Sequence, residues 1–317
     1  MDCHEKIVRI VNSIIDKYPC EMELRFNEPM AIHSSFKTGG QADCWIQPRG
    51  DGFPKFTASL FKAAKSEGIH VFILGGGANI VVSDNGIRGI VLDTGAWTGG
   101  KVQRRGILQF RSGTSLDEAA KIASDEGLAG LEFLKGMPGS IGGAAYMNAR
   151  AYGQEISDIL IETEVINFSN EPVSVLKLQA KKNEFSYKKS PFQGCGLFIL
   201  NASFQLTFSD PQKIQEKMAS YYKDRQEKGH YRFPSAGSVF KNNPCFGKPT
   251  GKIIDELGLK GMKIGGAQVA PFHGNIIINK GGAKAIDIFN LVNKVAAKVR
   301  AETGFSLEPE ILFIGDF

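Results

Sequence analysis

The chain has 317 residues, of which 42% are hydrophobic and 22% are charged, as in ordinary globular proteins. These values exclude a disordered, collagen-like or coiled-coil chain, and the length predicts about two domains. The formal net charge of +5 suits an anionic small molecule as well as a nucleic acid, so it selects no ligand by itself.

The sequence of the first half predicts three helices among short strands. Apolar residues recur at helical spacing from Ile7 to Ile15, which predicts an amphipathic helix up to Tyr18. Residues 32–48 carry turn-rich and apolar pieces around Lys37-Thr38-Gly39-Gly40. A helix is then expected over residues 56–67, and strands over 70–74, 79–83, 90–93 and 107–112. The next helix, over residues 115–126, begins at Ser115 with Glu118 completing a capping box.

In the second half, the composition of the chain changes near Ser209. Before it, strands are expected over residues 162–167, 172–176 and 197–206. After it, a charged helix over residues 213–228 leads to a glycine-rich turn over 235–243, a helix over 250–257 and a strand over 275–279. A strongly amphipathic helix over 285–303 and a strand over 309–314 end the series. This order predicts an α+β fold and not a regular βαβ alternation.

The five cysteines are scattered without a CxxC pair, which indicates reduced thiols and no structural metal site or disulfide framework. No run approaches 18 apolar residues, and the N-terminal helix is not the apolar core of a signal peptide. These features predict a cytoplasmic protein that crosses no membrane. The five histidines show no ligand spacing, so no metal is expected.

Three glycine-rich segments are candidate ligand-binding turns. The first, Gly75-Gly76-Gly77-Ala78-Asn79, can turn backbone N–H groups toward a phosphate, although a tight structural turn explains it equally well. It is neither a dinucleotide-binding GxGxxG motif nor a P-loop. The second, residues 136–143, has four glycines in eight residues and allows a bulky ligand to approach the backbone. The third, residues 235–242, adds a hydroxyl, an ammonium and an amide to one turn.

Five strings in these and neighbouring segments resemble the UDP-N-acetylenolpyruvoylglucosamine reductases of peptidoglycan synthesis. They are LGGGANIVVSDNGIRGIVL, LKGMPGSIGGAAYMNARAYGQEI, PSAGSVFKNNP, GLKGMKIGGAQVAPFHGNIIIN and LEPEILFIG. They follow the family's order from about Ser34 to Gly315. The resemblance is to the compact subtype that lacks an additional loop over the substrate.

The resemblance implies the fold and its parts. It implies a two-part FAD-binding domain of the vanillyl-alcohol-oxidase type, over residues 1–95 and 96–208. A C-terminal α+β substrate domain over residues 209–305 would follow, with a strand over 306–317 that brings Glu310 to the active site. FAD and NADPH would be the cofactors. The residues expected to line FAD are Thr38, Gly39, Gly75, Gly76, Gly77, Ala78, Asn79, Ile80, Ser112, Gly113, Gly136, Pro138, Gly139, Ser140, Gly142 and Gly143.

The resemblance also implies catalytic roles. NADPH would reduce the flavin, which then passes a hydride to the enolpyruvyl ether of a UDP sugar. An enolate-like charge would develop, which cations and hydrogen-bond donors stabilise, and a positioned acid would protonate the α-carbon. Ser238 matches the family's proton donor and Glu310 its acidic partner. Glu308, two residues away, is the alternative carboxylate.

Lys188 lies where the family has an arginine, in the string Tyr187-Lys188-Lys189-Ser190. An ammonium cannot form the bidentate fork of a guanidinium. Either Lys188 supplies the charge with looser geometry, or another arginine takes over the role. Arg150 is a candidate, since it stands where the family usually has glycine.

The substrate would be held by Tyr187, Lys241, Asn242 and His273, although a lone histidine such as His273 is as often a structural residue. The partner expected is a small UDP sugar, with no nucleic acid, membrane or obligate protein partner. Two alternatives stay open: an FAD-dependent oxidase of small alcohols or sugars, and a non-catalytic flavin- or nucleotide-sugar-binding protein. No histidine lies in either glycine-rich FAD segment to tether a flavin, which counts against the oxidase.

Overall fold

The computed structural model describes residues 3–169 and 172–317. It divides into two compact units: unit 1 comprises residues 1–26, 43–76 and 89–222, and unit 2 comprises residues 27–42, 77–88 and 223–317. Each unit is therefore assembled from three separate stretches of chain.

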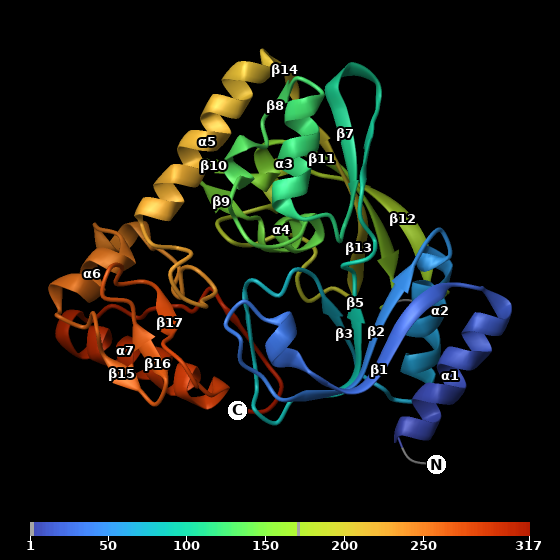
Figure 1. Ribbon diagram of the computed structural model, residues 1–317, viewed down its shortest axis with the longest axis horizontal. Helices are drawn as coiled ribbons and strands as arrows, with labels where there is room; N and C mark the ends of the chain where they lie inside the picture. The colour runs from blue at the N-terminus through green and yellow to red at the C-terminus, as the bar shows by residue number, and fades with distance from the viewer. Residues whose placement is uncertain (1–2, 170–171) are drawn as a thin grey trace. The chain divides into compact units, whose positions relative to one another are not determined.

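Unit 1 contains most of a four-stranded sheet of order β1-β2-β5-β3 (Figure 1), in which β3 and β5 run parallel. The elements are α1 (Cys3–Lys17), β1 (Glu21–Pro29), β2 (Gln41–Arg49), α2 (Phe53–Ser66), β3 (Val71–Leu74) and β5 (Ile87–Asp93). Helices α1 and α2 pack on each other, and their apolar faces share one core with β2 and β5.

A second, antiparallel sheet in unit 1 has the strand order β12-β11-β13-β7-β6. Its strands are β6 (Gly100–Val102), β7 (Ile107–Arg111), β11 (Leu160–Asn167), β12 (Ser174–Gln179) and β13 (Leu197–Gln205). Helix α4 (Ile141–Met147) packs on β7 and β13, and a core of apolar residues runs from the sheet to α3 (Leu116–Asp125). Short strand pairs, β8 (Leu128–Ala129) with β14 (Thr207–Phe208) and β9 (Arg150–Ala151) with β10 (Gln154–Glu155), complete the unit.

Unit 2 is built around a three-stranded sheet covered by one long helix (Figure 1). The strands are β15 (Lys263–Ile264), β16 (Ala267–Val269) and β17 (Ile277–Asn279), and α7 (Ala285–Thr303) packs on β15 and β16. Helix α6 (Thr250–Glu256) joins the same core. The C-terminal strand β18 (Leu312–Ile314) pairs in parallel with β4 (Ile80–Val82). Helix α5 (Pro211–Glu227) spans the sequence boundary between the units.

The predicted helices are confirmed, several of them to within a residue or two. The helix over 285–303 has the predicted bounds, and Ser115 caps α3 by accepting a hydrogen bond from the Glu118 amide at 3.1 Å. Helix α4 was not predicted; Ser140 caps it, and burial of Ile141 and Ala145 offsets its glycines. Residues 32–48, expected to carry turn-rich and apolar pieces, contain most of β2.

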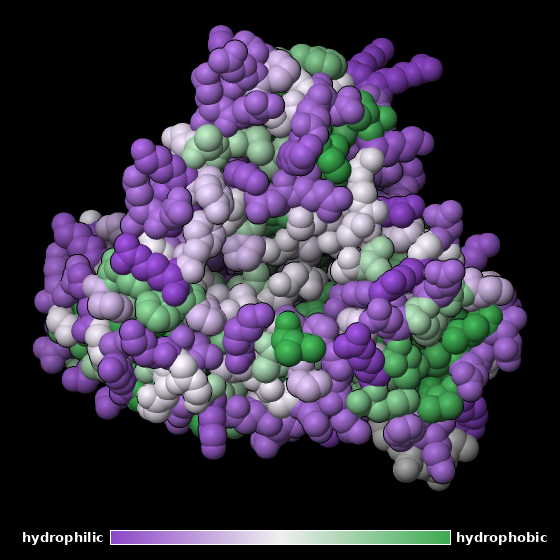
Figure 2. Space-filling view, in the orientation of Figure 1, coloured by the Kyte–Doolittle hydropathy of each residue, from purple (hydrophilic) through white to green (hydrophobic). Residues whose placement is uncertain are grey.

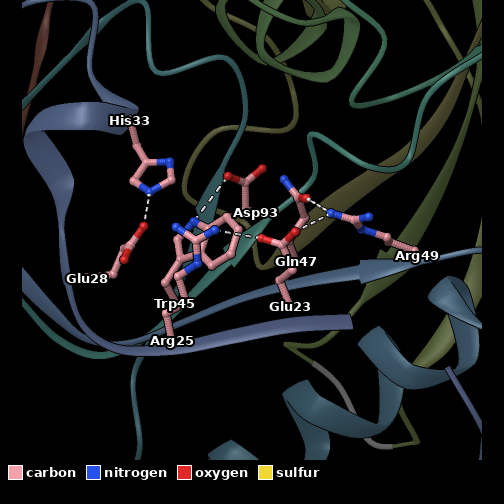
Figure 3. A network of polar contacts seen from close by, with 8 residues as sticks. All are labelled: Glu23, Arg25, Glu28, His33, Trp45, Gln47, Arg49 and Asp93. Atoms are coloured by element: carbon pink, nitrogen blue, oxygen red, sulfur yellow. Dashed lines mark hydrogen bonds and ion pairs between the residues drawn. The ribbon is translucent and has the colours of Figure 1, made fainter. Parts of the chain in front are cut away.

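Strand β1 was not predicted, although its side chains alternate. Met22, Leu24 and Phe26 lie against the α1–α2 core, and Figure 2 shows hydrophobic residues gathered over this corner of the molecule. The intervening Glu23 and Arg25 belong to a polar network with Arg49 (Figure 3), in which Glu23 Oε1 accepts from Arg49 at 2.6 Å. Because charged residues stand at positions 21, 23 and 25, the strand has only three apolar residues to signal it.

Candidate active site

In unit 1, the first glycine segment packs directly on the second. A Cβ atom added at Gly75 would lie 2.7 Å from Ser140 Oγ, and one at Gly76 would lie 2.6 Å from the Cα of Gly139. Real Cβ atoms do not come so close to backbone, so only glycine fits at Gly76. The two segments predicted to line a cofactor are therefore brought together.

Strand β3, which leads into this glycine turn, is held at its end by Thr94, the residue that follows β5. The Thr94 hydroxyl donates to the Leu74 carbonyl at 3.0 Å, and the neighbouring Asp93 carboxylate is buried. Asp93 accepts from the indole N–H of Trp45 at 3.1 Å (Figure 3) and from the Gly95 amide at 2.6 Å. Sequence reasoning missed this carboxylate, which holds the end of β5 beside the turn.

The second glycine segment also packs on Ser112 and Gly113. The Gly142 amide donates to the Ser112 carbonyl at 2.8 Å, and a Cβ at Gly142 would lie 2.7 Å from Ser112 Cβ. Gly113 lies against the Thr94 carbonyl. Gly136 has a φ of 73° and donates to Asp117 at 2.8 Å, while Pro138 is exposed. The unit 1 residues predicted to line FAD thus belong to connected turns and to the first turn of α4.

These residues fit a flavin cofactor. The Ser112 hydroxyl is buried and has no hydrogen-bond partner among the described residues. Buried polar groups are normally hydrogen-bonded, so a ligand oxygen or nitrogen would satisfy it. A Cβ at Gly143 would meet only Ser140 Oγ, at 3.5 Å, which leaves open space beside the backbone there. In unit 2 the buried Thr38 hydroxyl is likewise without a partner in the described chain.

The remaining cofactor candidates lie together in unit 2. The Ser35 amide donates to the Gly77 carbonyl at 3.0 Å, and the Ser35 hydroxyl donates to that of Ala78 at 3.3 Å. Gly39 has a φ of 128° and packs against Val82 of β4, which begins at Ile80. A neighbouring pair, His33 Nε2 and Glu28 Oε1, lies 2.9 Å apart (Figure 3).

We expect the alanine variants of two neighbouring glycines to separate folding from cofactor binding. Gly142→Ala should destabilise the protein by about 1–3 kcal/mol, because the new methyl group overlaps Ser112. Gly143→Ala should leave the melting temperature unchanged or higher, since alanine favours helix over glycine, but should weaken FAD binding. Thermal unfolding of FAD-free protein and titration with FAD measure the two effects. Unchanged FAD affinity in Gly143→Ala would show that Gly143 does not line the cofactor.

Ser238 lies in a turn of unit 2 that is held by contacts with Ile276 and Asn275. It bridges to Ile276, and the following Val239 amide donates to the Asn275 carbonyl at 2.9 Å. The buried Asn275 side chain accepts from the Phe240 amide at 2.9 Å and donates to its carbonyl at 2.8 Å. Sequence reasoning missed Asn275; a polar residue at the start of an apolar strand was its only signal. Ser238 itself is partly buried.

The chain around Glu310 lies beside the Ser238 turn. Its amide donates to the Val239 carbonyl at 2.7 Å, and its carbonyl accepts from Asn79 Nδ2 at 3.0 Å. Glu310 is partly buried, whereas Glu308 is exposed. The structure therefore brings the predicted carboxylate, the predicted proton donor and Asn79 of the first glycine segment into one part of unit 2.

Lys241 and Glu308 form an ion pair in which Lys241 Nζ lies 2.5 Å from Glu308 Oε1. The Lys241 side chain is 15% exposed and that of Glu308 is 65% exposed. Glu308 thus holds the ammonium predicted to meet a diphosphate. Asn242 has a local structural role, because its Oδ1 accepts from the Thr250 amide at 2.9 Å at the start of α6.

His273 and His230 are partly buried with ring centroids 6.4 Å apart. Burial lowers the pKa of His230 from 6.5 to about 4, and the charges of Arg225, His273 and Lys228 add to this effect. Burial likewise lowers the pKa of His273, whose Nδ1 accepts from the Asn275 amide at 3.1 Å. His273 therefore contacts the residue that fixes the Ser238 turn.

The lowered pKa of His230 predicts a loss of stability in acid. The unfolded chain takes up the proton near the ordinary histidine pKa of about 6.5, while the folded chain does so only near pH 4. The free energy of unfolding should therefore fall as the pH falls from about 6.5 to 4. Urea unfolding at several pH values measures this slope, which should be shallower in His230→Gln. An equal slope in the variant and the parent would refute the assignment.

In unit 1, Tyr187 and Lys188 occupy the tip of a tight turn closed by mutual backbone hydrogen bonds between Ser186 and Lys189. Lys188 has a φ of 59°. Its Nζ lies 5.9 Å from the centroid of the Tyr187 ring, and the Arg150 Cζ lies 5.7 Å from the same centroid. The lysine at the position where an arginine was expected thus lies near the same ring as Arg150.

Among residues 3–169 and 172–317, no group of three or more His, Cys, Asp or Glu side chains is placed to hold a metal ion. No helix within these residues is long and apolar enough to cross a membrane. Cys20, Cys44, Cys195 and Cys245 are free thiols.

Comparisons with known proteins agree with this geometry. Residues 57–174 match the family model of an FAD binding domain, and residues 229–314 match that of the UDP-N-acetylenolpyruvoylglucosamine reductase C-terminal domain. The reductase of that name from Borreliella burgdorferi is 42% identical over 287 residues, covering 90% of this chain and 93% of the relative. That from Treponema denticola is 38% identical over 320 residues, covering 96% and 98%. The crystal structure of the Thermus caldophilus enzyme superposes with a TM-score of 0.74 at 28% identity, covering 93% of this chain and all of that one.

Proposed function

Because the chain belongs to the UDP-N-acetylenolpyruvoylglucosamine reductase family, we propose that Ser238, Glu310 and Lys188 carry out its substrate half-reaction. The chain is an FAD-dependent oxidoreductase, a UDP-N-acetylmuramate dehydrogenase of peptidoglycan precursor synthesis. The predicted fold, an FAD-binding domain of the vanillyl-alcohol-oxidase type followed by a C-terminal substrate domain, is confirmed. So are the predicted cofactors of the family, FAD and NADPH.

FAD, when bound, supplies the hydride-transfer chemistry. In unit 1, the residues proposed to hold it are Ser112, Gly142 and Gly143. The buried Ser112 hydroxyl, which has no hydrogen-bond partner among the described residues, supports this proposal. The glycine turns supply backbone that a large planar ligand can approach closely.

The proposed work of the protein is to manage charge and a proton on the substrate. Lys188 stabilises the negative charge that grows on the enolpyruvyl carboxylate as the β-carbon accepts a hydride. Ser238 gives its hydroxyl proton to the α-carbon. Glu310 assists Ser238. The observation that carries this assignment is the backbone pairing of Glu310 with Val239, the residue next to Ser238.

The proposed substrate contacts are Lys241 and Asn242 for the nucleotide diphosphate and its hydroxyls, with Tyr187 and His273. Lys241 supports this role best, because its ammonium is held by Glu308 beside the Ser238 turn. We further propose that the protein acts in the cytoplasm, on a small UDP sugar and without a nucleic acid, membrane or obligate protein partner. The free thiols of its described cysteines support a reducing compartment.

An anaerobic two-step flavin assay tests the function. NADPH should bleach the flavin absorbance near 450 nm, and UDP-N-acetylglucosamine enolpyruvate should then restore it with formation of UDP-N-acetylmuramate. An FAD-dependent oxidase would instead be reduced by a small alcohol or sugar and reoxidised by oxygen. A non-catalytic binding protein would show neither step. Failure of the enolpyruvyl substrate to restore the absorbance would refute the proposal.

A further inference from the structure

Two cationic side chains of unit 1 lie near the ring of Tyr187. The distance to its centroid is 5.7 Å from Arg150 Cζ and 5.9 Å from Lys188 Nζ. Both distances lie within the range of about 6 Å over which a ring attracts a cation. Like charges near one another repel, and an anion bound beside them relieves that repulsion. Arg150 and Lys188 thus lie near one ring, and an anion bound between them would interact with both.

The backbone of Lys188 adds a second observation. With a φ of 59°, it has the left-handed conformation that glycine adopts at least cost. The turn from Ser186 to Lys189 would accept glycine or asparagine there more readily. A residue held in such a conformation suggests a function for its side chain, here the presentation of a cation at the tip of the turn.

Arg150 is tied to this turn through its own chain segment. Asn148, two residues before Arg150, is fully buried, and its Nδ2 donates to the Ser186 carbonyl at 3.1 Å. Gln193 Nε2 donates both to the Tyr146 carbonyl at 2.8 Å and to the Lys188 carbonyl at 3.3 Å. The segment that carries Arg150 and the turn that carries Lys188 are thus held together by hydrogen bonds from the side chains of Asn148 and Gln193 to backbone carbonyls.

Asp158, whose carboxylate attracts Arg150, already has another partner. Asp158 Oδ1 lies 2.6 Å from Lys182 Nζ, and this hydrogen bond is the main cause of the lowered pKa of Asp158; Arg150 contributes only a smaller attraction. Arg150 is itself exposed. Its guanidinium can therefore take up a carboxylate without first breaking a close ion pair with Asp158.

We propose that Arg150 is a second cation of the anion-stabilising site and binds the carboxylate of the enolpyruvyl substrate together with Lys188. A guanidinium binds a carboxylate through two parallel hydrogen bonds, which an ammonium cannot do. Arg150 thus supplies the fork that is lost where lysine replaces the arginine of the family. This inference rests on the proposed function and concerns residues of one turn and one neighbouring segment.

Binding of two nucleotide sugars to the FAD-loaded enzyme tests the inference. UDP-N-acetylmuramate carries a carboxylate, and UDP-N-acetylglucosamine carries none. Titration calorimetry of Arg150→Met should show the first bound about tenfold to a hundredfold more weakly, as for loss of a charged hydrogen-bonded pair, and the second bound as in the parent. Equal loss for both ligands would indicate a structural defect and overturn the inference.

Two further variants complete the test. Lys181→Met removes a positive charge from the neighbouring position, whose partner is Glu184 and not Asp158, and should leave both affinities unchanged. Adding Lys188→Arg to Arg150→Met should restore much of the affinity for UDP-N-acetylmuramate, because it rebuilds the fork at the turn. If Arg150→Met binds UDP-N-acetylmuramate like the parent, the inference is wrong while the function stands. If the parent is not reoxidised by the enolpyruvyl substrate, the proposed function itself is wrong.

Discussion

Ser238→Ala should give a protein whose flavin is bleached by NADPH and stays bleached when UDP-N-acetylglucosamine enolpyruvate is added without oxygen. The substitution removes the proposed proton donor but leaves the Asn275 hydrogen bonds that hold the turn. General acids contribute about 10²- to 10⁴-fold to a rate, and loss of a sole donor reaches the upper end. Stopped-flow absorbance of the two half-reactions measures the effect.

Two controls make the Ser238 result specific. Ser235→Ala changes a serine of the same turn and should be reoxidised like the parent. Ser238→Cys places another acid at nearly the same position and should recover part of the rate. Reoxidation of the alanine variant at the parent rate would mean that Ser238 is only a turn residue and that the proton comes from elsewhere.

Glu310→Gln should slow reoxidation by substrate by about 10²-fold or more, within the range for groups that assist proton transfer. The reason is the position of Glu310, whose backbone pairs with Val239 and whose carbonyl is fixed by Asn79. Flavin reduction by NADPH should be nearly unaffected. The measurement is again the separate rate of each half-reaction, together with the melting temperature as a check on folding.

Glu308→Gln is the matched control, with a different expected defect. It removes the partner of Lys241, so it should raise the KM for the UDP sugar by no more than about fivefold, the effect of an exposed ion pair. Its turnover number should stay close to that of the parent. A larger loss of turnover in Glu308→Gln than in Glu310→Gln would reverse the assignment of the two carboxylates.

Local patterns predicted the elements whose signal lies within a few residues. The helix α7 carries its apolar stripe from Ile288 to Val299 within one segment, and all of that stripe is buried. Helix α4 has two glycines among seven residues, and its stability comes from packing on β7 and β13, which no local pattern shows. Propensity is a weak guide where tertiary packing decides.

The candidate site also has a part that a local pattern reveals and a part that depends on contacts distant in sequence. The turn around Ser238 was recognisable from its own residues, but Asn275, which fixes it, lies 35 positions from its partner Phe240. The pairing of Lys241 with Glu308 spans 67 positions. One sequence without an alignment carries no signal for such distant contacts. The role of Arg150 beside Tyr187 was an open alternative because a contact between residues 38 positions apart, from Asn148 to Ser186, ties the Arg150 segment to the Tyr187 turn.

The parallel pairing of β18 with β4, in register from Leu312 with Ile80 to Ile314 with Val82, bears on the order of folding. It closes a loop of about 230 residues, and contacts so distant in sequence form late and slowly. During synthesis, the last stretch of unit 1 ends at residue 222, so that unit can fold on the ribosome. Unit 2 cannot finish folding until residues 307–314 have been synthesised. Until then β4, the strand next to the first glycine turn, lacks its partner β18 and has an unpaired edge. Nascent chains that stall in this interval would expose that edge to aggregation.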